Sequence, residues 1–385
     1  MIIGYDAKRI VCNNTGLGSY SRTLVNDLAE AVGPDTMLHL YAPDEGNGEL
    51  RSQIVPSAHV RFVYPDHCHN ALTKAWWRMH GMVADMVRHG VTLYHGLSGE
   101  LPIGIKQAGI KTVVTIHDLI FLRHPEWYNP IDAKIYTWKF HNTCREADRI
   151  IAISECTKRD VVTFGGVSPD KIDVVYQSCG SRYAVKESDK KMQEVHTRYM
   201  LPSRYIVNVG SIEERKNILL AVQALRLLPD DVSLVVVGRP TAYCDRVKRY
   251  VQKNRLDHRV LFLHGVPNAD LPAIYQMAEV CVYPSRYEGF GIPVIEAIQS
   301  GLPVVACTGS CLEEAGGNGT LYVSPDDVAG MASAVSRVLR GAPERQERIE
   351  ESRQYVRRFE NNSLARQVLQ VYEKTLHGMG QAHNI

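Results

Sequence analysis

The sequence predicts an α/β fold with two doubly wound, Rossmann-like domains that face each other across a cleft. Its 385 residues exceed what one ordinary hydrophobic core accommodates and suit two domains of conventional size. Short apolar runs rich in β-branched residues alternate with longer stretches of helical periodicity, which is typical of parallel sheets covered by helices. The alternation starts again in the second half of the chain, so a second sheet is expected.

The strands are expected in order along the chain. An apolar and aromatic run predicts the first strand at residues 1–5. Similar runs predict the rest of the first sheet at 38–42, 60–64, 91–95, 112–116, 149–153 and 172–176. The second sheet is expected at 205–209, 233–237, 260–263, 280–283, 303–306 and 320–323. Ligands are expected at the carboxyl ends of these strands, where doubly wound folds bind them.

The strand signal stops at residues 177–204, where charged residues gather. We place the domain boundary near Gly180, so that residues 1–180 form the first domain and residues 181–358 the second. The last segment, 359–385, is expected to form a helix with one apolar face. The residues of that face are Leu364, Val368, Val371 and Tyr372.

The composition is that of an ordinary soluble globular protein, with 45% apolar and 22% charged residues. A net charge of +2 gives no basic field, so no nucleic-acid partner is expected. The nine cysteines are scattered without a C-x-x-C pair, which predicts neither a disulfide framework nor a zinc site and suits a reducing cytosol. Without a signal-peptide core or an apolar run of membrane-spanning length, the chain is expected to be cytoplasmic, or peripheral on the inner face of a membrane.

The most informative segment is residues 284–297, PSRYEGFGIPVIEA, which follows an expected strand. Here a glycine loop leads into a helix whose first turn holds Pro293, where a missing N–H is no loss. Free amides at Gly289 to Gly291 and the positive end of the helix dipole attract an anion. Glu288 lies before the helix and Glu296 about two turns into it, so the two carboxylates can touch different parts of one ligand.

A basic pair follows the first expected strand of the second domain. Arg215 and Lys216 come after two glutamates and before an apolar helix that begins near Ile218. The arginine offers a planar fork and the lysine a point charge, which suits the two phosphates of a diphosphate. Alone, such a pair usually lies in a solvated helix start. Its position relative to the Glu288 segment favours phosphate binding instead.

The first domain offers a weaker glycine signal. Gly16 and Gly18 are expected to form a loop before a helix. Ser21 stands where the dinucleotide fingerprint has its third glycine, and no strand ends directly before Gly16, so NAD binding is not expected. A phosphate-facing loop and a simple tight turn both fit.

Two further strand ends carry polar residues. His117 and Asp118 end the expected strand 112–116, where side chains face a ligand, although a histidine there is structural about as often as catalytic. Ser154 follows the next expected strand and is interpreted as the N-cap of a helix.

The run E-G-F-G-x-P-x-x-E-A at 288–297, followed by G-L-P-V-V-A at 301–306, strongly resembles the donor-site signature of glycosyltransferase family 4, which has the GT-B fold. The resemblance extends from Gly16 to about Val323, and the last helix fits the family habit of crossing back onto the first domain. It departs at residues 177–180, Q-S-C-G, where many relatives have an Asn-Gly pair, which puts only the interdomain hinge in doubt.

The resemblance implies a nucleotide-sugar donor site. By it Glu288 contacts hexose hydroxyls, Glu296 holds the ribose, and the Arg215–Lys216 pair binds the pyrophosphate. His117 is implied to meet the donor hexose near the reacting carbon, so His117, Glu288, Arg215 and Lys216 form the expected catalytic set. The expected donor-binding residues are Gly16, Gly18, Arg215, Lys216, Glu288, Gly289, Phe290, Gly291 and Glu296.

The implied reaction moves a hexose, with retention of configuration, onto a saccharide or lipid-linked acceptor in surface polysaccharide or glycoconjugate synthesis. Because no D-x-D pair occurs, no bridging metal and no cofactor are expected, and Arg215, Lys216 and the helix dipole stabilise the leaving group instead. The T-I-H-D-L and H-G-L-S segments look like those of bacterial mannosyltransferases, so GDP-mannose is the expected donor, with a UDP-hexose close behind.

Three other activities share this architecture. A nucleotide-sugar epimerase would convert the donor without an acceptor, and a phosphorylase would need a lysine-bound pyridoxal phosphate. A sugar-nucleotide-binding protein without activity would turn nothing over. The intact glutamate pair and the basic segment favour transfer over all three.

The acceptor side is expected in the first domain. Residues 72–80, LTKAWWRMH, fit either an amphipathic helix with buried tryptophans, which we favour, or contact with an anionic membrane beside a lipid-linked acceptor. Glu100, which follows the strand expected at 91–95, and Asp118 are the expected acceptor-side residues.

Overall fold

The computed structural model describes residues 1–66, 68, 70–359 and 363–378, and the chain divides into two compact units. Unit 1 consists of Met1–Gln177 and Asn361–Ile385, and unit 2 is Ser178–Glu360. The chain therefore leaves unit 1 and returns to it only for its last helix. The division lies close to the boundary predicted near Gly180.

Unit 1 is built on a seven-stranded sheet in the order β3-β2-β1-β4-β5-β6-β7, counted over the described residues, and its neighbouring strands pair in parallel. The strands are β1 (Ile2–Asp6), β2 (Met37–Tyr41), β3 (Val60–Val63), β4 (Leu93–Gly96), β5 (Lys111–Ile116), β6 (Arg149–Ala152) and β7 (Ile172–Val174). Each predicted strand of the first sheet is confirmed. The strand order reverses between β1 and β4, the point at which doubly wound sheets bind ligands.

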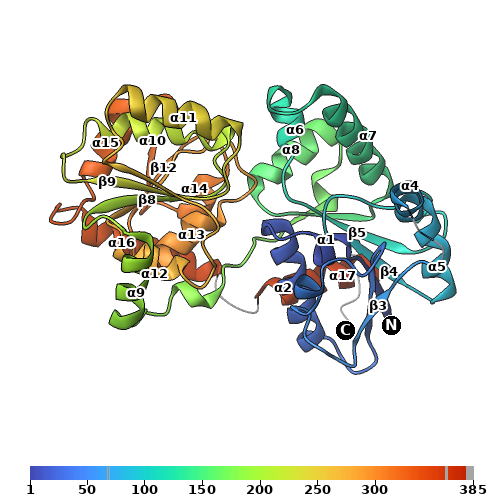
Figure 1. The fold of residues 1–385 in the computed structure, drawn as a ribbon. Helices are drawn as coiled ribbons and strands as arrows, with labels where there is room; N and C mark the ends of the chain where they lie inside the picture. The colour runs from blue at the N-terminus through green and yellow to red at the C-terminus, as the bar shows by residue number, and fades with distance from the viewer. Residues whose placement is uncertain (67, 69, 360–362, 379–385) are drawn as a thin grey trace. The chain divides into compact units, whose positions relative to one another are not determined.

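Helices cover both faces of this sheet (Figure 1). They are α1 (Lys8–Cys12), α2 (Gly16–Ala31), α3 (Gly48–Arg51), α4 (Ala71–Trp76), the π-helix η1 (Trp77–Gly81), α5 (Met82–Arg88), α6 (Ile120–Arg123), η2 (Pro125–Trp127), α7 (Pro130–Glu146), α8 (Glu155–Gly165), η3 (Pro169–Lys171) and α17 (Ser363–His377). α1, α2 and α17 pack on one face, and η1, α5, α7 and α8 on the other. The Ser154 side chain caps α8, as predicted.

α17 belongs to the core of unit 1. Its predicted apolar face is buried, with Leu364, Val368, Val371 and Tyr372 at most 3% exposed, and the helix contacts α2 and β5. The Tyr372 hydroxyl lies 2.6 Å from His95 Nδ1 and donates to the Tyr5 hydroxyl at 3.2 Å. Residues 360–362 and 379–385 of the predicted last segment lie outside the described residues.

Unit 2 repeats the architecture with a six-stranded parallel sheet in the order β10-β9-β8-β11-β12-β13, again counted over the part of the chain that the structure describes. The strands are β8 (Tyr205–Val209), β9 (Ser233–Val237), β10 (Val260–Leu263), β11 (Val280–Tyr283), β12 (Val304–Cys307) and β13 (Leu321–Val323), which confirms the second predicted sheet. Here the strand order reverses between β8 and β11.

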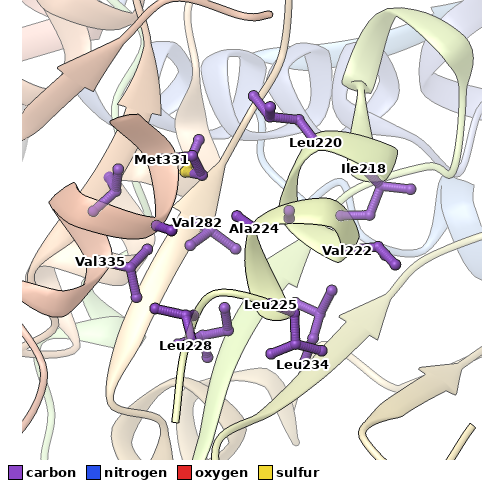
Figure 2. Close-up of a cluster of buried hydrophobic side chains, with 14 of the residues drawn as sticks. Ile218, Leu220, Val222, Ala224, Leu225, Leu228, Leu234, Val282, Met331 and Val335 are labelled. Atoms are coloured by element: carbon purple, nitrogen blue, oxygen red, sulfur yellow. The ribbon is translucent and has the colours of Figure 1, made fainter. Parts of the chain in front are cut away.

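The helices of unit 2 also lie on both faces of its sheet (Figure 1). They are η4 (Ser181–Tyr183), α9 (Asp189–Tyr199), η5 (Glu214–Lys216), α10 (Ile218–Leu225), α11 (Ala242–Lys253), α12 (Leu271–Met277), α13 (Ile292–Gln299), α14 (Leu312–Gly316), α15 (Val328–Ser336), α16 (Arg345–Val356) and η6 (Arg357–Phe359). Figure 2 shows the core beneath α10 and α15, where Met331 and Val335 face Val282 and Ala224. This packing fixes the start of α10, directly after the predicted basic pair.

Candidate active site

The predicted donor residues of unit 2 meet where the strand order reverses. β8 leads into η5, which carries Arg215 and Lys216, and β11 leads into the loop that carries Glu288. Because β8 and β11 are neighbours in the sheet, their two following loops lie side by side. The Arg286 amide donates to the Arg215 carbonyl oxygen at 2.8 Å and ties the loops together.

Glu288 lies between the two cations. The residue is 7% exposed, with Oε2 at 2.9 Å from Arg215 Nη1 and Oε1 at 2.5 Å from Lys216 Nζ. Lys216 Nζ also donates to the Tyr283 hydroxyl at 2.7 Å, which holds the ammonium in place. Burial would raise the pKa of Glu288, but the charges of Lys216 and Arg215 outweigh it and hold this pKa at about 2. Glu288 is therefore an anion of very low basicity.

The glycine loop opens α13, as predicted. Gly291 precedes the helix with φ at 113°, a left-handed conformation that favours glycine, and an added Cβ would come within 2.8 Å of Leu312 Cδ2. Pro293 lies in the first turn, and no described side chain caps the helix. The Cys311 thiol lies 3.1 Å and 2.9 Å from the carbonyl oxygens of Glu288 and Phe290. These contacts hold the two loop carbonyls on the protein side. In the first turn of α13, Pro293 has no N–H and the Val294 amide donates to the Gly291 carbonyl oxygen at 2.9 Å.

Glu296 lies apart from the ion-paired cluster. No hydrogen bond or ion pair between described residues joins it to Glu288, and the Tyr275 hydroxyl donates to its Oε2 at 3.2 Å. Burial raises the pKa of Glu296 to about 7, against the opposing hydrogen bonds from Tyr183 and Tyr275. The expectation that Glu296 lies two turns into the helix is wrong, because α13 begins only at Ile292.

Gly16 and Gly18 do not form the expected loop; both lie in the first turn of α2. The helix starts early because Asn13 Oδ1 accepts hydrogen bonds from the amides of Thr15 at 2.8 Å and Gly18 at 3.2 Å. A Cβ on Gly18 would come within 1.9 Å of the Asn13 carbonyl oxygen, whereas one on Gly16 would meet nothing within 4 Å. Packing thus requires glycine only at position 18.

Both ring nitrogens of His117 have partners. Nε2 lies 2.9 Å from the Leu97 carbonyl oxygen, and Nδ1 lies 3.0 Å from the Gln177 side-chain nitrogen. A carbonyl accepts and an amide NH₂ donates, so the ring is neutral with its proton on Nε2. Burial lowers the pKa of His117 to about 4. The ring of Tyr20 in α2 makes a T-shaped contact with the His117 ring, with 4.8 Å between the two ring centroids. This histidine is not built to supply a proton at neutral pH.

The two predicted acceptor-side residues, Asp118 and Glu100, have different structural roles. Asp118 Oδ1 accepts from the Ile120 amide at 3.2 Å and starts α6, whereas Glu100 pairs with Arg78 and Lys139. No sequence pattern singles out Arg78; its nearest signal is the tryptophan-rich segment around it. In that segment Trp77 is 5% exposed, as the favoured interpretation requires, but Trp76 is 62% exposed. The expectation of buried tryptophans is thus wrong for one of the two.

Neither a metal centre nor a membrane span is found among the described residues. They contain no group of three or more His, Cys, Asp or Glu placed to hold a metal ion. Over the same residues, no helix has both the length and the apolar character that a membrane crossing requires.

Comparison with known proteins matches both halves of the chain to family models. "Glycosyltransferase Family 4" matches residues 15–178, and "Glycosyl transferases group 1" matches residues 193–355. The O-antigen chain mannosyltransferase B of Escherichia coli is 31% identical over 253 residues, 64% of this chain and 65% of that protein. The serotype-specific mannosyltransferase WbdA of Escherichia coli is 27% identical over 67% of this chain and 33% of its own length. The chain thus spans less than two thirds of these curated relatives.

Among solved structures, Anabaena Alr3699/HepE in complex with UDP and glucose shares the fold, with a TM-score of 0.73 over 96% of this chain and 98% of that one, at 17% identity. The two matched regions, the two parallel-sheet units and this shared fold agree. The chain belongs to glycosyltransferase family 4, with the two α/β domains of the GT-B fold.

Proposed function

We propose that the chain transfers a hexose from a nucleotide diphosphate sugar to a saccharide or lipid-linked saccharide acceptor, with retention of configuration and without a metal ion. The observation that carries this proposal is the cluster of Arg215, Lys216 and Glu288 before the N-terminus of α13. It lies where the strand order of unit 2 reverses, the place at which a doubly wound sheet binds its ligand.

The cluster suits a leaving diphosphate. Arg215 and Lys216 face the buried carboxylate of Glu288, and Arg215 Nε also lies 3.3 Å from the half-buried carboxylate of Glu213. The arginine offers a planar fork and the lysine a point charge to the two phosphates of the donor. The cations are already fixed by Glu288 and Tyr283, so little reorganisation is needed when charge develops on the departing phosphate. Arg215, Lys216 and the positive end of the α13 dipole take the place of a bridging metal ion.

Retention is supported by the low basicity of the nearby groups. A carboxylate with a pKa of about 2 is a poor nucleophile and a poor base, and His117 is neutral with both nitrogens engaged. Attack of the acceptor from the leaving-group face needs neither group, because the departing phosphate takes the acceptor proton. The hexose then keeps its anomeric configuration.

Mannose is the proposed hexose, and GDP-mannose the proposed donor. The support is the similarity to two mannosyltransferases, at 31% and 27% identity. A UDP-hexose is the second candidate, favoured by the shared fold of a structure that contains UDP and glucose.

A panel of sugar nucleotides tests the donor. We expect GDP-mannose to raise the melting temperature of the chain more than UDP-glucose or UDP-galactose does, and the product glycoside to show the α configuration by NMR. Lys216→Met should abolish the shift, whereas Arg286→Ala, which removes an exposed ion pair with Asp326, should keep it. A shift with UDP-sugars alone would reject the mannose assignment, and an inverted product would reject the retaining mechanism.

A further inference from the structure

Two buried tyrosines surround the carboxyl group of Glu296. Tyr275 of α12 is 0% exposed, and its hydroxyl donates to Glu296 Oε2 at 3.2 Å. Tyr183 of η4 is 5% exposed and also hydrogen-bonds this carboxyl group. The two tyrosine rings make a T-shaped contact with 5.9 Å between their centroids. The two phenols therefore form one group beside the carboxylate, which we call the tyrosine pair.

The tyrosine pair favours the ionised form of Glu296. Burial, and after it the charge of Glu296, raises the pKa of both phenols, so each keeps its proton at neutral pH. A carboxylate accepts hydrogen bonds and donates none, so two phenol donors oppose the burial that disfavours its charge. Arg182 of η4 and the Cys281 thiol of β11 also interact with Glu296, and the charge of Arg182 acts in the same direction as the phenols.

Tyr275 stands on a helix that its neighbours hold in place. Asp270, which precedes α12, is 2% exposed and lies 2.6 Å from Lys191 Nζ of α9. The Tyr205 hydroxyl of β8 donates to the Ile274 carbonyl oxygen in α12 at 2.6 Å. The Tyr275 hydroxyl is therefore directed at the carboxylate before any ligand arrives, which reduces the entropy lost when a ligand binds.

The next side chain of α12 holds the segment that carries Tyr183. Gln276 Oε1 accepts from the Glu187 amide at 2.9 Å, and Gln276 Nε2 donates to the Val185 carbonyl oxygen at 2.8 Å. These two bonds fasten the backbone just after η4 to α12. One short helix thus fixes both phenols, since it contains Tyr275 and holds the chain beside Tyr183.

We propose that Tyr275 and Tyr183 are positioning residues of the donor site, which hold Glu296 as an oriented carboxylate for the ribose hydroxyls of the sugar nucleotide. An ionised carboxyl group can accept from both hydroxyls of a ribose, whereas a protonated one loses part of this capacity. The tyrosine pair therefore sets the pH above which the donor binds well. This inference rests on the proposed function, because it concerns the donor of that transfer.

The ionisation of Glu296 tests the tyrosine pair without any donor. NMR of the full chain, with glutamate labelled at its carboxyl carbon, follows this ionisation, and Glu296→Gln identifies the signal by its loss. We expect Tyr275→Phe to raise the pKa of Glu296 by about one unit, the size expected when a charge-assisted hydrogen bond is lost. Tyr183→Phe should raise the same pKa and provides a second variant if the first does not fold.

Tyr205→Phe is the matched control. Tyr205 is also a buried phenol of unit 2, and its hydroxyl bonds to the backbone of the residue before Tyr275. It makes no hydrogen bond to Glu296 among the described residues. Tyr205→Phe should therefore leave the Glu296 titration unchanged, even if it lowers the free energy of unfolding as much as Tyr275→Phe does.

Calorimetric titration with GDP-mannose relates this ionisation to the donor. The Kd of the unaltered chain should fall about tenfold between pH 6 and pH 8, as a group with a pKa of about 7 ionises. In Tyr275→Phe the fall should come about one pH unit higher, so that the Kd is raised severalfold at pH 7 and is normal again at pH 9. A loss of binding through general destabilisation would not be reversed by raising the pH.

An unchanged Glu296 titration in both Tyr275→Phe and Tyr183→Phe would overturn the proposal, even with normal donor binding. A Kd for GDP-mannose with the same pH profile in Tyr275→Phe as in the unaltered chain would also overturn it. A chain that binds no sugar nucleotide at any pH would remove the proposed function instead, while the NMR titration still decides whether the tyrosine pair acts on Glu296.

Discussion

Glu288 and Glu296 come from one short segment, yet their surroundings shift their ionisation in opposite directions. Lys216 and Arg215 overcome burial at Glu288 and hold its pKa at about 2. At Glu296 burial dominates and the pKa rises to about 7. At neutral pH the first group is always ionised, while the second is close to half protonated.

Glu288→Gln should lower kcat by about tenfold or more, because a charge-assisted hydrogen bond that strengthens in the transition state contributes about 1.5 to 3 kcal/mol. Glu296→Gln should act chiefly on KM for the donor, because the ribose it is predicted to hold does not change during the reaction. Steady-state kinetics with varied donor separate the two effects once circular dichroism shows both variants folded. Normal turnover by Glu288→Gln would refute its assignment.

The free energy of unfolding should fall with rising pH as Glu296 ionises. A carboxyl whose pKa is raised by folding binds its proton more tightly in the folded chain, so its ionisation destabilises the fold between about pH 4.5 and 7. Glu296→Gln removes this penalty and should stabilise unit 2 by up to about 3 kcal/mol at pH 8. At pH 4 the variant should match the unaltered chain. Urea unfolding of the variant and of the unaltered chain at both pH values checks this. Equal free energies of unfolding at pH 8 would show that ionised Glu296 does not destabilise the fold.

The sequence predicts the individual donor-site residues better than the contacts between them. Glu288, Arg215 and Lys216 stand in local patterns that the chemistry of phosphate binding makes recognisable. Their mutual pairing is a tertiary contact across more than seventy residues, which no local pattern contains. Arg78 belongs to no pattern at all, because only the fold brings it to Asp6 and Glu100.

At the scale of elements, strands are easier to predict than helix starts. Runs such as 205–209 and 233–237 are β-branched and clearly bounded, and they match β8 and β9 residue for residue. The start of α2 is predicted too late because glycine disfavours helix, so that Gly16 and Gly18 resemble a loop. The cap by Asn13 Oδ1 overrides that local preference. The π-helix η1 has no sequence signature that periodicity detects.

These two glycines form a matched pair for testing α2. Gly18→Ala forces a Cβ against the Asn13 carbonyl and should destabilise unit 1 by about 1 to 3 kcal/mol or more. Gly16→Ala meets open space and should stabilise the helix by up to about 1 kcal/mol. Chemical unfolding of both variants measures the difference. If Gly16 approaches donor phosphate as predicted, Gly16→Ala will also raise KM for the donor; equal stability of the two variants would contradict the close packing of Gly18 against Asn13.

The Tyr372 hydroxyl should stabilise the packing of α17 on unit 1, as the apolar face of the helix does. Tyr372→Phe leaves His95 Nδ1 and the Tyr5 hydroxyl without this partner in the core, at a cost of about 1 to 3 kcal/mol. Tyr250→Phe removes a phenol that accepts an exposed hydrogen bond from Arg226, and it should cost much less. Denaturant midpoints of the two variants test this, and similar midpoints would mean that the buried network contributes nothing.

At the scale of the whole molecule, both units place a charged cluster where their strand order reverses. The cluster of unit 2 pairs Arg215 and Lys216 with Glu213 and Glu288, and the cluster of unit 1 pairs Arg78 and Lys139 with Asp6 and Glu100. The prediction of two parallel-sheet domains is confirmed because the alternation of strand and helix is visible in each half. Their predicted arrangement across a cleft stays a prediction.

Hexose transfer should survive excess chelator. The cations of Arg215 and Lys216 and the positive end of the α13 dipole are proposed to stabilise the diphosphate, so removal of divalent ions should change the rate less than about twofold. Rates measured with EDTA, with magnesium and with manganese test this on the same preparation. Loss of activity in EDTA with rescue by either ion would show that a metal is required.

The route of the chain through its units sets an order for synthesis on the ribosome. Unit 2 is one continuous stretch and can finish folding as soon as it has emerged, whereas unit 1 must wait for α17. At ~5–20 residues per second, the wait is roughly 10 to 40 s. Throughout that time the surface of α2 and β5 that receives α17, with His95 and Tyr5 beneath it, has no cover. The half that is made first is therefore completed last, and it is the half that a chaperone would need to shield.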